Sequence, residues 1–283
     1  MVGVGYGMQD ELPAFSWPIR EEDQPRVLAV PWQEITPEWA WGGATGEGVK
    51  VCLVDSGVDA EHPMLGGMLK GGAVVERGDD GVIIREEAHD DLFGHGTACG
   101  GIIHGLAPEA EIYSVRVLGP NLKGSGEALV EGVRWAVEHG MDVINLSLST
   151  RKLEHIESLH RLADQAYFQR SVVVASANNT PVLSYPWLFS SVISVASHAD
   201  QEPHTFYYNP EPPVEFTAPG VDLELAWADG ALITGTGNSY ATPHISGIVA
   251  QILSKHRQLT PFQIKTVLYY TAKNVREALG KNQ

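Results

Sequence analysis

Three short stretches of this chain carry residue types that could do chemistry together: a serine, a histidine and an aspartate, each close to glycine. Ser239 lies within Gly235–His244, and the apolar run that follows, Ile245–Leu253, predicts a buried helix that begins near the serine. A hydroxyl oxygen there would lie at the positive end of the helix dipole, where free backbone N–H groups can receive a developing anion. Taken alone, however, a serine before a helix is more often only an N-cap.

Asp55 and His95 are equally ambiguous when each is considered by itself. Asp55 follows Val49–Val54, an apolar, β-branched run that is typical of a buried parallel strand. Ligands of open α/β sheets gather at the carboxyl ends of strands, although an aspartate there can also simply close a turn. His95 stands between Gly94 and Gly96, which lets the backbone pass close to a neighbour, but a lone histidine is usually structural.

The elements that would position these residues alternate along the chain. Apolar runs predict strands at 49–54, 111–118, 141–148, 171–175 and 192–196, and helical patterns begin near 95 and cover 127–138, 151–169 and 245–253. Residues 66–87 are expected to form turns and a hairpin. This alternation predicts an α/β fold in a single domain, with a doubly wound, mostly parallel β-sheet flanked by helices. Within it we expect an N-terminal arm at 1–25, the folded domain at 26–275 and a C-terminal tail at 276–283.

Composition narrows the possible functions. The chain has 283 residues, is 43% hydrophobic and 19% charged, and carries a net charge of −16. These values indicate a globular protein, argue against a nucleic-acid-binding surface and suit a cationic peptide partner. We also expect no signal peptide, no membrane-spanning helix and, because Cys52 and Cys99 are the only cysteines, no disulfide framework. Reduced thiols favour a cytoplasmic location.

Taken together, Asp55-Ser56-Gly57, His95-Gly96-Thr97 and the segment around Ser239 resemble the subtilisin-like serine proteases, in the chain order aspartate, histidine, serine. The similarity extends from about residue 30 to about residue 272 and includes Gly105–Leu148 and Val172–Asn179. It implies a subtilisin-like fold and serine endopeptidase activity.

The resemblance also implies a role for each matching residue. Ser239 would attack the scissile carbonyl, His95 would act as the general base and then the general acid, and Asp55 would orient His95. Asn179 stands where this family supplies a side-chain amide to the oxyanion, although without the other motifs it would be read as a turn residue.

Substrate is expected to lie extended between two segments and to pair with them in antiparallel fashion. By resemblance, one segment is Gly124-Ser125-Gly126 and the other is Ser147-Leu148-Ser149. The side chain before the scissile bond would enter a pocket bounded by Ser147–Ser149 and by Ser176-Ala177-Asn178, with Thr180 and Ser184 at its rim and floor. These residues are small and neutral, so we expect an uncharged side chain of modest size there.

Several positions depart from the family pattern. Asn238 and Asn178 replace the usual threonine and glycine. Asn238 keeps a polar side chain, so we expect catalysis to be retained with altered fine tuning, and the Asn178 side chain is expected to narrow the pocket. The helix after His95 lacks the calcium-binding loop of secreted members, so we expect no metal or other cofactor, while weak calcium sites elsewhere stay open. Cys99, four residues after His95, would share its face of a helix, where a bulky thiol reagent would crowd the imidazole.

The acidic residues before His95 allow two interpretations. Glu86, Glu87, Asp90 and Asp91 either form a solvated loop, the more common case, or line neighbouring subsites and favour basic substrate residues.

The expected function is therefore a serine endopeptidase of narrow specificity that acts on an extended peptide or a precursor protein, for instance by removing a leader. The N-terminal arm is read as a tail, a strap or a short inhibitory segment. Two alternatives stay open, namely a catalytically silent peptide-binding scaffold and acyl transfer that gives ligation or macrocyclisation. No nucleic-acid or membrane partner is expected, and the sequence leaves the oligomeric state undetermined.

Overall fold

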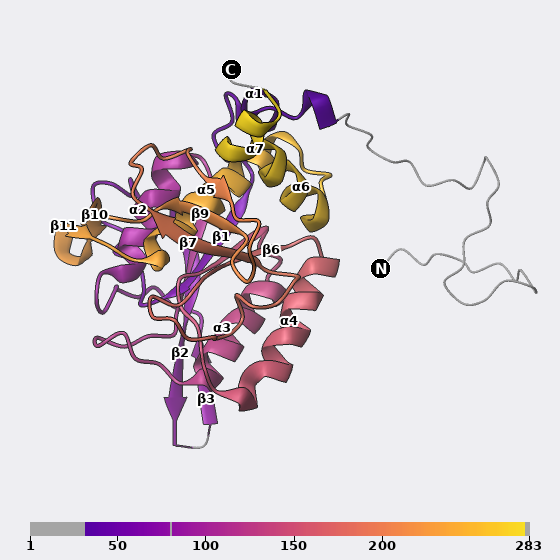
Figure 1. The fold of residues 1–283 in the computed structure, drawn as a ribbon. Helices are drawn as coiled ribbons and strands as arrows, with labels where there is room; N and C mark the ends of the chain where they lie inside the picture. The colour runs from indigo at the N-terminus through magenta and orange to yellow at the C-terminus, as the bar shows by residue number, and fades with distance from the viewer. Residues whose placement is uncertain (1–31, 80, 281–283) are drawn as a thin grey trace, which may run out of the picture. The chain divides into compact units, whose positions relative to one another are not determined.

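The structure is a computed structural model that describes residues 32–79 and 81–280 (Figure 1). The chain divides into two units, Met1–Glu34 and Ile35–Gln283. Of the first unit, only the 3₁₀ turn η2 (Trp32–Glu34) lies within the described residues. The whole of the predicted arm at 1–25 therefore lies outside them. The sheet and the α-helices of the fold belong to the second unit.

A nine-stranded sheet organises this unit, in the order β3-β2-β4-β1-β5-β6-β7-β9-β8. The seven strands from β2 to β9 along this order pair in parallel, while β3 and β8 close the two edges by antiparallel pairing. The strands are β1 (Lys50–Asp55), β2 (Leu69–Gly78), β3 (Gly81–Arg85), β4 (Glu111–Arg116), β5 (Val143–Leu146), β6 (Val172–Ser176), β7 (Ile193–His198), β8 (Tyr207–Tyr208) and β9 (Phe216–Pro219).

Helices cover both faces of the sheet. Helices α2 and α5 pack together on one face, and α3 and α4 pack together on the other (Figure 1). A separate two-stranded sheet, β10 with β11, lies against α2. The helices are α1 (Pro37–Trp41), α2 (His95–Leu106), α3 (Gly126–Glu138), α4 (Ile156–Phe168), α5 (Asn238–Lys255), α6 (Pro261–Thr271) and α7 (Lys273–Ala278), and the small sheet contains β10 (Leu223–Trp227) and β11 (Ala231–Gly235). The predicted doubly wound α/β fold is confirmed.

Two local predictions need correction. The expected helix at 151–169 begins only at Ile156, because Leu153–His155 forms the 3₁₀ turn η3 and Leu153 is 73% exposed. Residues 66–87 do contain the predicted hairpin, β2 with β3, but β2 also joins the main sheet by pairing in parallel with β4.

The sheet interior explains why the strands read as apolar runs. Every residue of β5 and β6 is buried, as are five of the six residues of β1, so these central strands are covered on both faces. Their carboxyl ends carry Asp55, Leu146 and Ser176 to one edge of the sheet, where loops and helix N-termini meet. Among the described residues, no helix is long and apolar enough to cross a membrane.

Candidate active site

A buried carboxylate–imidazole pair lies at this edge. His95 Nδ1 is 2.8 Å from Asp55 Oδ1, and the same oxygen accepts the backbone N–H of Ser56 at 2.7 Å. Asp55 is 1% exposed and His95 is 5% exposed. Burial alone would lower the pKa of His95, but the charge and hydrogen bond of Asp55, with a contribution from Asp91, outweigh it and raise that pKa. The pair is therefore suited to hold a proton on the imidazole.

A second buried aspartate, Asp91, holds the N-terminus of α2, the helix that carries His95. The Asp91 carboxylate accepts the backbone N–H groups of Phe93, Gly94 and Thr97, and also the hydroxyl groups of Ser56 and Thr97, at 2.7–3.0 Å. It thereby satisfies donors at the start of α2, whose N-cap, Gly94, has a φ of 114° and no capping side chain. An aspartate just before a helix is the signal that could have identified this role.

Two of the other acidic residues before His95 form contacts with nearby side chains. Glu86 accepts a hydrogen bond from Trp135 Nε1 at 2.9 Å and lies 3.0 Å from His139, while Glu87 pairs with Arg85 at 3.0 Å. Asp91 is buried, with 9% of its surface exposed. The interpretation of this stretch as a wholly solvated loop is therefore wrong for Asp91.

Ser239 lies in the first turn of α5, as predicted. The N-cap is Gly237, which has no capping side-chain bond, so Ser239 is not the N-cap. The carbonyl of Ser239 accepts hydrogen bonds from Ser147 Oγ at 2.8 Å and from Cys99 Sγ at 3.6 Å. Because Cys99 lies one helical turn after His95, and the ring of Tyr240 lies 5.3 Å from the His95 ring, the start of α5 adjoins the carboxylate–imidazole pair.

The Asn179 side chain reaches the same space. Asn179 Oδ1 accepts the backbone N–H of Asn238 at 2.8 Å, which leaves its amide nitrogen as the outward donor. A Cβ atom added to Gly237 would lie 3.3 Å from Ser239 Oγ and 3.4 Å from Asn179 Nδ2. A hydroxyl group and an amide donor thus border one small space at the N-terminus of a helix, which is the arrangement needed to receive an oxyanion.

The two asparagines that depart from the family pattern join this loop to α5. Asn238 Oδ1 accepts hydrogen bonds from the backbone N–H and the hydroxyl of Ser197, and Asn238 Nδ2 donates to the Asn178 carbonyl at 3.1 Å. Asn178 Oδ1 in turn accepts from the backbone and hydroxyl of Thr180. Asn178 does not have a positive φ, so the turn does not use the left-handed conformation that asparagine tolerates.

The two predicted substrate-binding segments lie at the ends of different elements. Ser125 caps α3 by accepting the Ala128 N–H at 3.0 Å, and Gly126 has no room for a side chain because a Cβ atom would lie 2.1 Å from the His155 ring. On the other side, Ser147–Ser149 directly follow β5, and Ser176 ends β6 and precedes Ala177.

Ser184 lies beneath this second side, as expected for a pocket floor. It is fully buried, and its hydroxyl lies 2.8 Å from Ser149 Oγ and accepts the indole N–H of Trp187 at 2.9 Å. Thr180, expected at the rim, is exposed.

Cys99 is a buried neighbour of the pair. Together with Asp55 and His95, it forms the one group of three metal-ligand side chains found in the described part of the chain, with ligand atoms within 4.8 Å of one another. Burial raises the pKa of the Cys99 thiol well above its usual range, and the nearby Asp55 charge adds to this. The thiol therefore acts here as a hydrogen-bond donor to Ser147 Oγ at 3.4 Å.

Comparisons with known proteins agree with this geometry. The model of the Subtilase family (Peptidase S8) matches residues 46–283. Subtilisin DY of Bacillus licheniformis is 31% identical over 251 residues, which cover 83% of this chain and 88% of that protein. An intracellular serine protease of Paenibacillus polymyxa is 30% identical over 250 residues, which cover 83% of this chain and 75% of that protein.

A comparison with solved structures finds the same fold. The crystal structure of a cold-adapted subtilisin-like serine proteinase superimposes with a TM-score of 0.65 at 25% identity, covering 82% of this chain and 87% of that one. The chain spans between 36% and 88% of the length of the curated relatives that it matches.

Proposed function

We propose that this chain, which belongs to the subtilase family of serine proteases, cleaves internal peptide bonds with Asp55, His95 and Ser239 as its catalytic triad and Asn179 as an oxyanion donor. The observation that carries the proposal is the buried Asp55–His95 pair at 2.8 Å, beside a helix N-terminus where Ser239 Oγ and Asn179 Nδ2 border one space.

Each step then follows from the chemistry of these groups. Ser239 Oγ attacks the scissile carbonyl carbon while the imidazole of His95 accepts its proton, and Asp55 stabilises the resulting imidazolium. The negative charge on the carbonyl oxygen is stabilised by the Asn179 amide and by the Ser239 backbone N–H at the start of α5. His95 then donates its proton to the leaving amine, which leaves an acyl ester on Ser239. Attack by water, with His95 again as the base, releases the second product.

For the substrate, we propose an extended peptide that pairs with 124–126 on one side and 147–149 on the other. The pocket for the side chain before the scissile bond is bounded by 147–149 and 176–178. Ser149 and Ser184 approach each other across its base. None of the described residues assigned to the pocket, 147–149, 176–178, 180 and 184, carries a carboxylate that could pair with lysine or arginine. Small, uncharged side chains are therefore preferred.

Narrow specificity is the finer part of the proposal, with a precursor or leader peptide as the natural substrate. It is supported by the neutral, hydrogen-bonded pocket base and by the His155 ring, which occupies the space beside Gly126. Within the sequence we propose an N-terminal arm at 1–25, a peptidase domain at 26–275 and a tail at 276–283. We further propose a cytoplasmic location, since both cysteines are free and buried and one relative is an intracellular protease.

The test is covalent labelling with a fluorophosphonate, followed by intact-mass measurement. Wild-type protein should take up one equivalent on Ser239, whereas the Ser239→Ala variant should take up none. A Ser254→Ala variant, which removes another hydroxyl on α5 away from the site, should label like wild type. Absence of labelling in folded wild-type protein would contradict the proposed nucleophile.

A further inference from the structure

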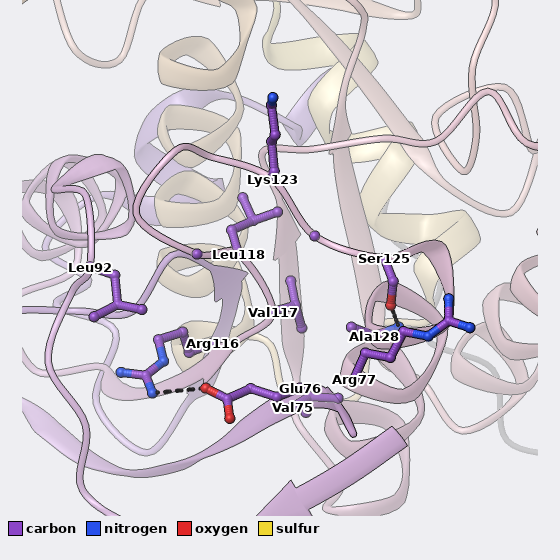
Figure 2. A pocket seen from close by; sticks show the side chains of 12 residues that line it. Val75, Glu76, Arg77, Leu92, Arg116, Val117, Leu118, Lys123, Ser125 and Ala128 are labelled. Atoms are coloured by element: carbon purple, nitrogen blue, oxygen red, sulfur yellow. Dashed lines mark hydrogen bonds and ion pairs between the residues drawn. The ribbon is translucent and has the colours of Figure 1, made fainter. Parts of the chain in front are cut away.

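A cavity of about 320 Å³ lies beside the N-terminus of α3, and Figure 2 shows its lining side chains. Gly124 and Ser125, which belong to the proposed substrate-binding segment, form part of its wall. The lining consists of Val75, Glu76, Arg77, Leu92, Arg116, Val117, Leu118, Gly119, Lys123, Gly124, Ser125 and Ala128. The cavity therefore opens next to the position where the proposed function seats the substrate backbone.

Its apolar walls are attached directly to the residues around the catalytic aspartate. The Leu118 N–H donates to the Asp55 carbonyl at 3.1 Å, and the Leu92 N–H donates to the Ser56 carbonyl at 3.0 Å. Leu92 is 40% exposed and contributes an apolar surface to the cavity.

The alternation of side chains along an extended substrate indicates which substrate residue would occupy this cavity. Side chains of an extended peptide alternate between its two sides. If the residue before the scissile bond points into the pocket at 147–149, the residue preceding it points the opposite way, toward Leu118 and Leu92.

The charged groups of the lining are mostly cationic. Arg77, Arg116 and Lys123 face a single carboxylate, Glu76. Glu76 is already engaged: it accepts from Arg85 at 2.9 Å and from Arg116 at 3.4 Å, and the Arg85 hydrogen bond in particular lowers its pKa. In Figure 2 the Arg116–Glu76 pair runs along one side of the cavity, with Lys123 and Arg77 at its margin.

The two marginal cations keep most of their charge available. Lys123 is exposed and has no ion-pair partner within residues 32–79 and 81–280. Within the part of the chain that the structure describes, Arg77 forms an ion pair only with Glu127, at 3.5 Å, and both side chains are largely exposed, so this pair is weak. The acidic residues before His95, namely Glu86, Glu87, Asp90 and Asp91, do not line the cavity. In a chain with a net charge of −16, this is a local cationic site.

We propose that this cavity is a subsite for an acidic substrate side chain, glutamate above all, at the second residue before the scissile bond. The aliphatic stem of the glutamate lies against Leu92 and Leu118, and its carboxylate meets the ammonium group of Lys123 at the margin of the cavity. The proposal rests on the proposed function, because it assumes that 124–126 binds the substrate backbone.

The test compares synthetic peptides that differ only at this position, with glutamate, glutamine, leucine or lysine. At low ionic strength, wild-type kcat/KM should be about two- to tenfold higher for glutamate than for glutamine, as expected from one or two solvent-screened ion pairs. The preference should shrink in 0.5 M NaCl. A Lys123→Glu variant should favour lysine over glutamate instead.

The matched control is Lys70→Glu, which makes the same charge change at an exposed position at the start of β2, remote from the cavity. It should retain the wild-type preference. Equal rates for glutamate and glutamine, a preference for leucine over both, or identical behaviour of the two variants would overturn the subsite.

A binding measurement separates this proposal from the proposed function. Fluorescence anisotropy with labelled glutamate and lysine peptides and the Ser239→Ala variant requires no catalysis. If wild type cleaves no peptide, the proposed function fails, while tighter binding of the glutamate peptide would still support the subsite and equal binding would refute it.

Discussion

Replacing Asp91 tests how α2 holds His95 in place. This carboxylate accepts five hydrogen bonds and joins the end of β1, through Ser56, to the first turn of α2. In Asp91→Asn, the amide nitrogen cannot accept, and because each carboxylate oxygen accepts at least two of these hydrogen bonds, two donors lose their partner. At about 1–3 kcal/mol for each such donor, we expect the free energy of unfolding to fall by about 2–4 kcal/mol.

The same change should alter the pH dependence of activity. His95 must be neutral to accept the serine proton, so kcat/KM falls as the pH drops through the raised pKa of His95, above its usual value of about 6.5. Removing the negative charge of Asp91 removes one of the effects that raise this pKa. The acidic limb of the pH profile should therefore move to lower pH in Asp91→Asn.

Stability is best measured by urea unfolding in the Ser239→Ala background, which prevents self-digestion, and the pH profile in the active background. Asp90→Asn is the matched control, because its exposed neighbouring side chain has the same charge. If Asp91→Asn unfolds at the same urea concentration as Asp90→Asn and keeps the wild-type acidic limb, the positioning role of Asp91 is refuted.

Three further predictions follow from individual contacts. Asn179→Leu should lower kcat by about 10²–10³ with little change in KM, a range that comes from a member of this same family; an unchanged kcat in steady-state kinetics would exclude it as an oxyanion donor. An organomercurial should inactivate wild type but not Cys99→Ala, while Cys52→Ala should stay sensitive, because only Cys99 touches the Ser239 carbonyl and Ser147; equal sensitivity of both variants would refute this. Gly126→Ala should be destabilised by about 1–3 kcal/mol because its Cβ would meet the His155 ring, and His155→Ala should restore stability in the double variant; strictly additive losses in thermal unfolding would contradict the clash.

The regular part of the fold could be predicted because the sequence patterns there are strong. Continuous apolar runs identified the central strands, since both of their faces are buried. The pairing of β2 with β4 could not be inferred, because seven of the ten residues of β2 are not buried and its glycines resemble turns. The late start of α4 was missed because Leu153 has the right spacing for the apolar face yet lies in a 3₁₀ turn, exposed to solvent.

The same distinction applies to the active site, where residues within motifs could be predicted and residues defined by tertiary contacts could not. Asp55, His95, Asn179 and Ser239 were found by motif, and the fold brings them to one edge of the sheet. The residues that hold them were missed because their roles depend on tertiary contacts. Asn145 is an example: it is fully buried, donates to Ser147 Oγ at 3.0 Å and accepts from Ser246 Oγ at 2.8 Å, which links β5 to α5. A polar residue inside an apolar strand was the available signal.

The central claim is that Ser239, activated by His95 and Asp55, hydrolyses peptide bonds. The most direct measurement is digestion of an unbiased peptide library by wild-type protein and by Ser239→Ala, read by mass spectrometry. We predict that wild type generates new peptide termini at a restricted set of sequences and that Ser239→Ala generates none. Cleavage by both proteins at the same sites would contradict the claim.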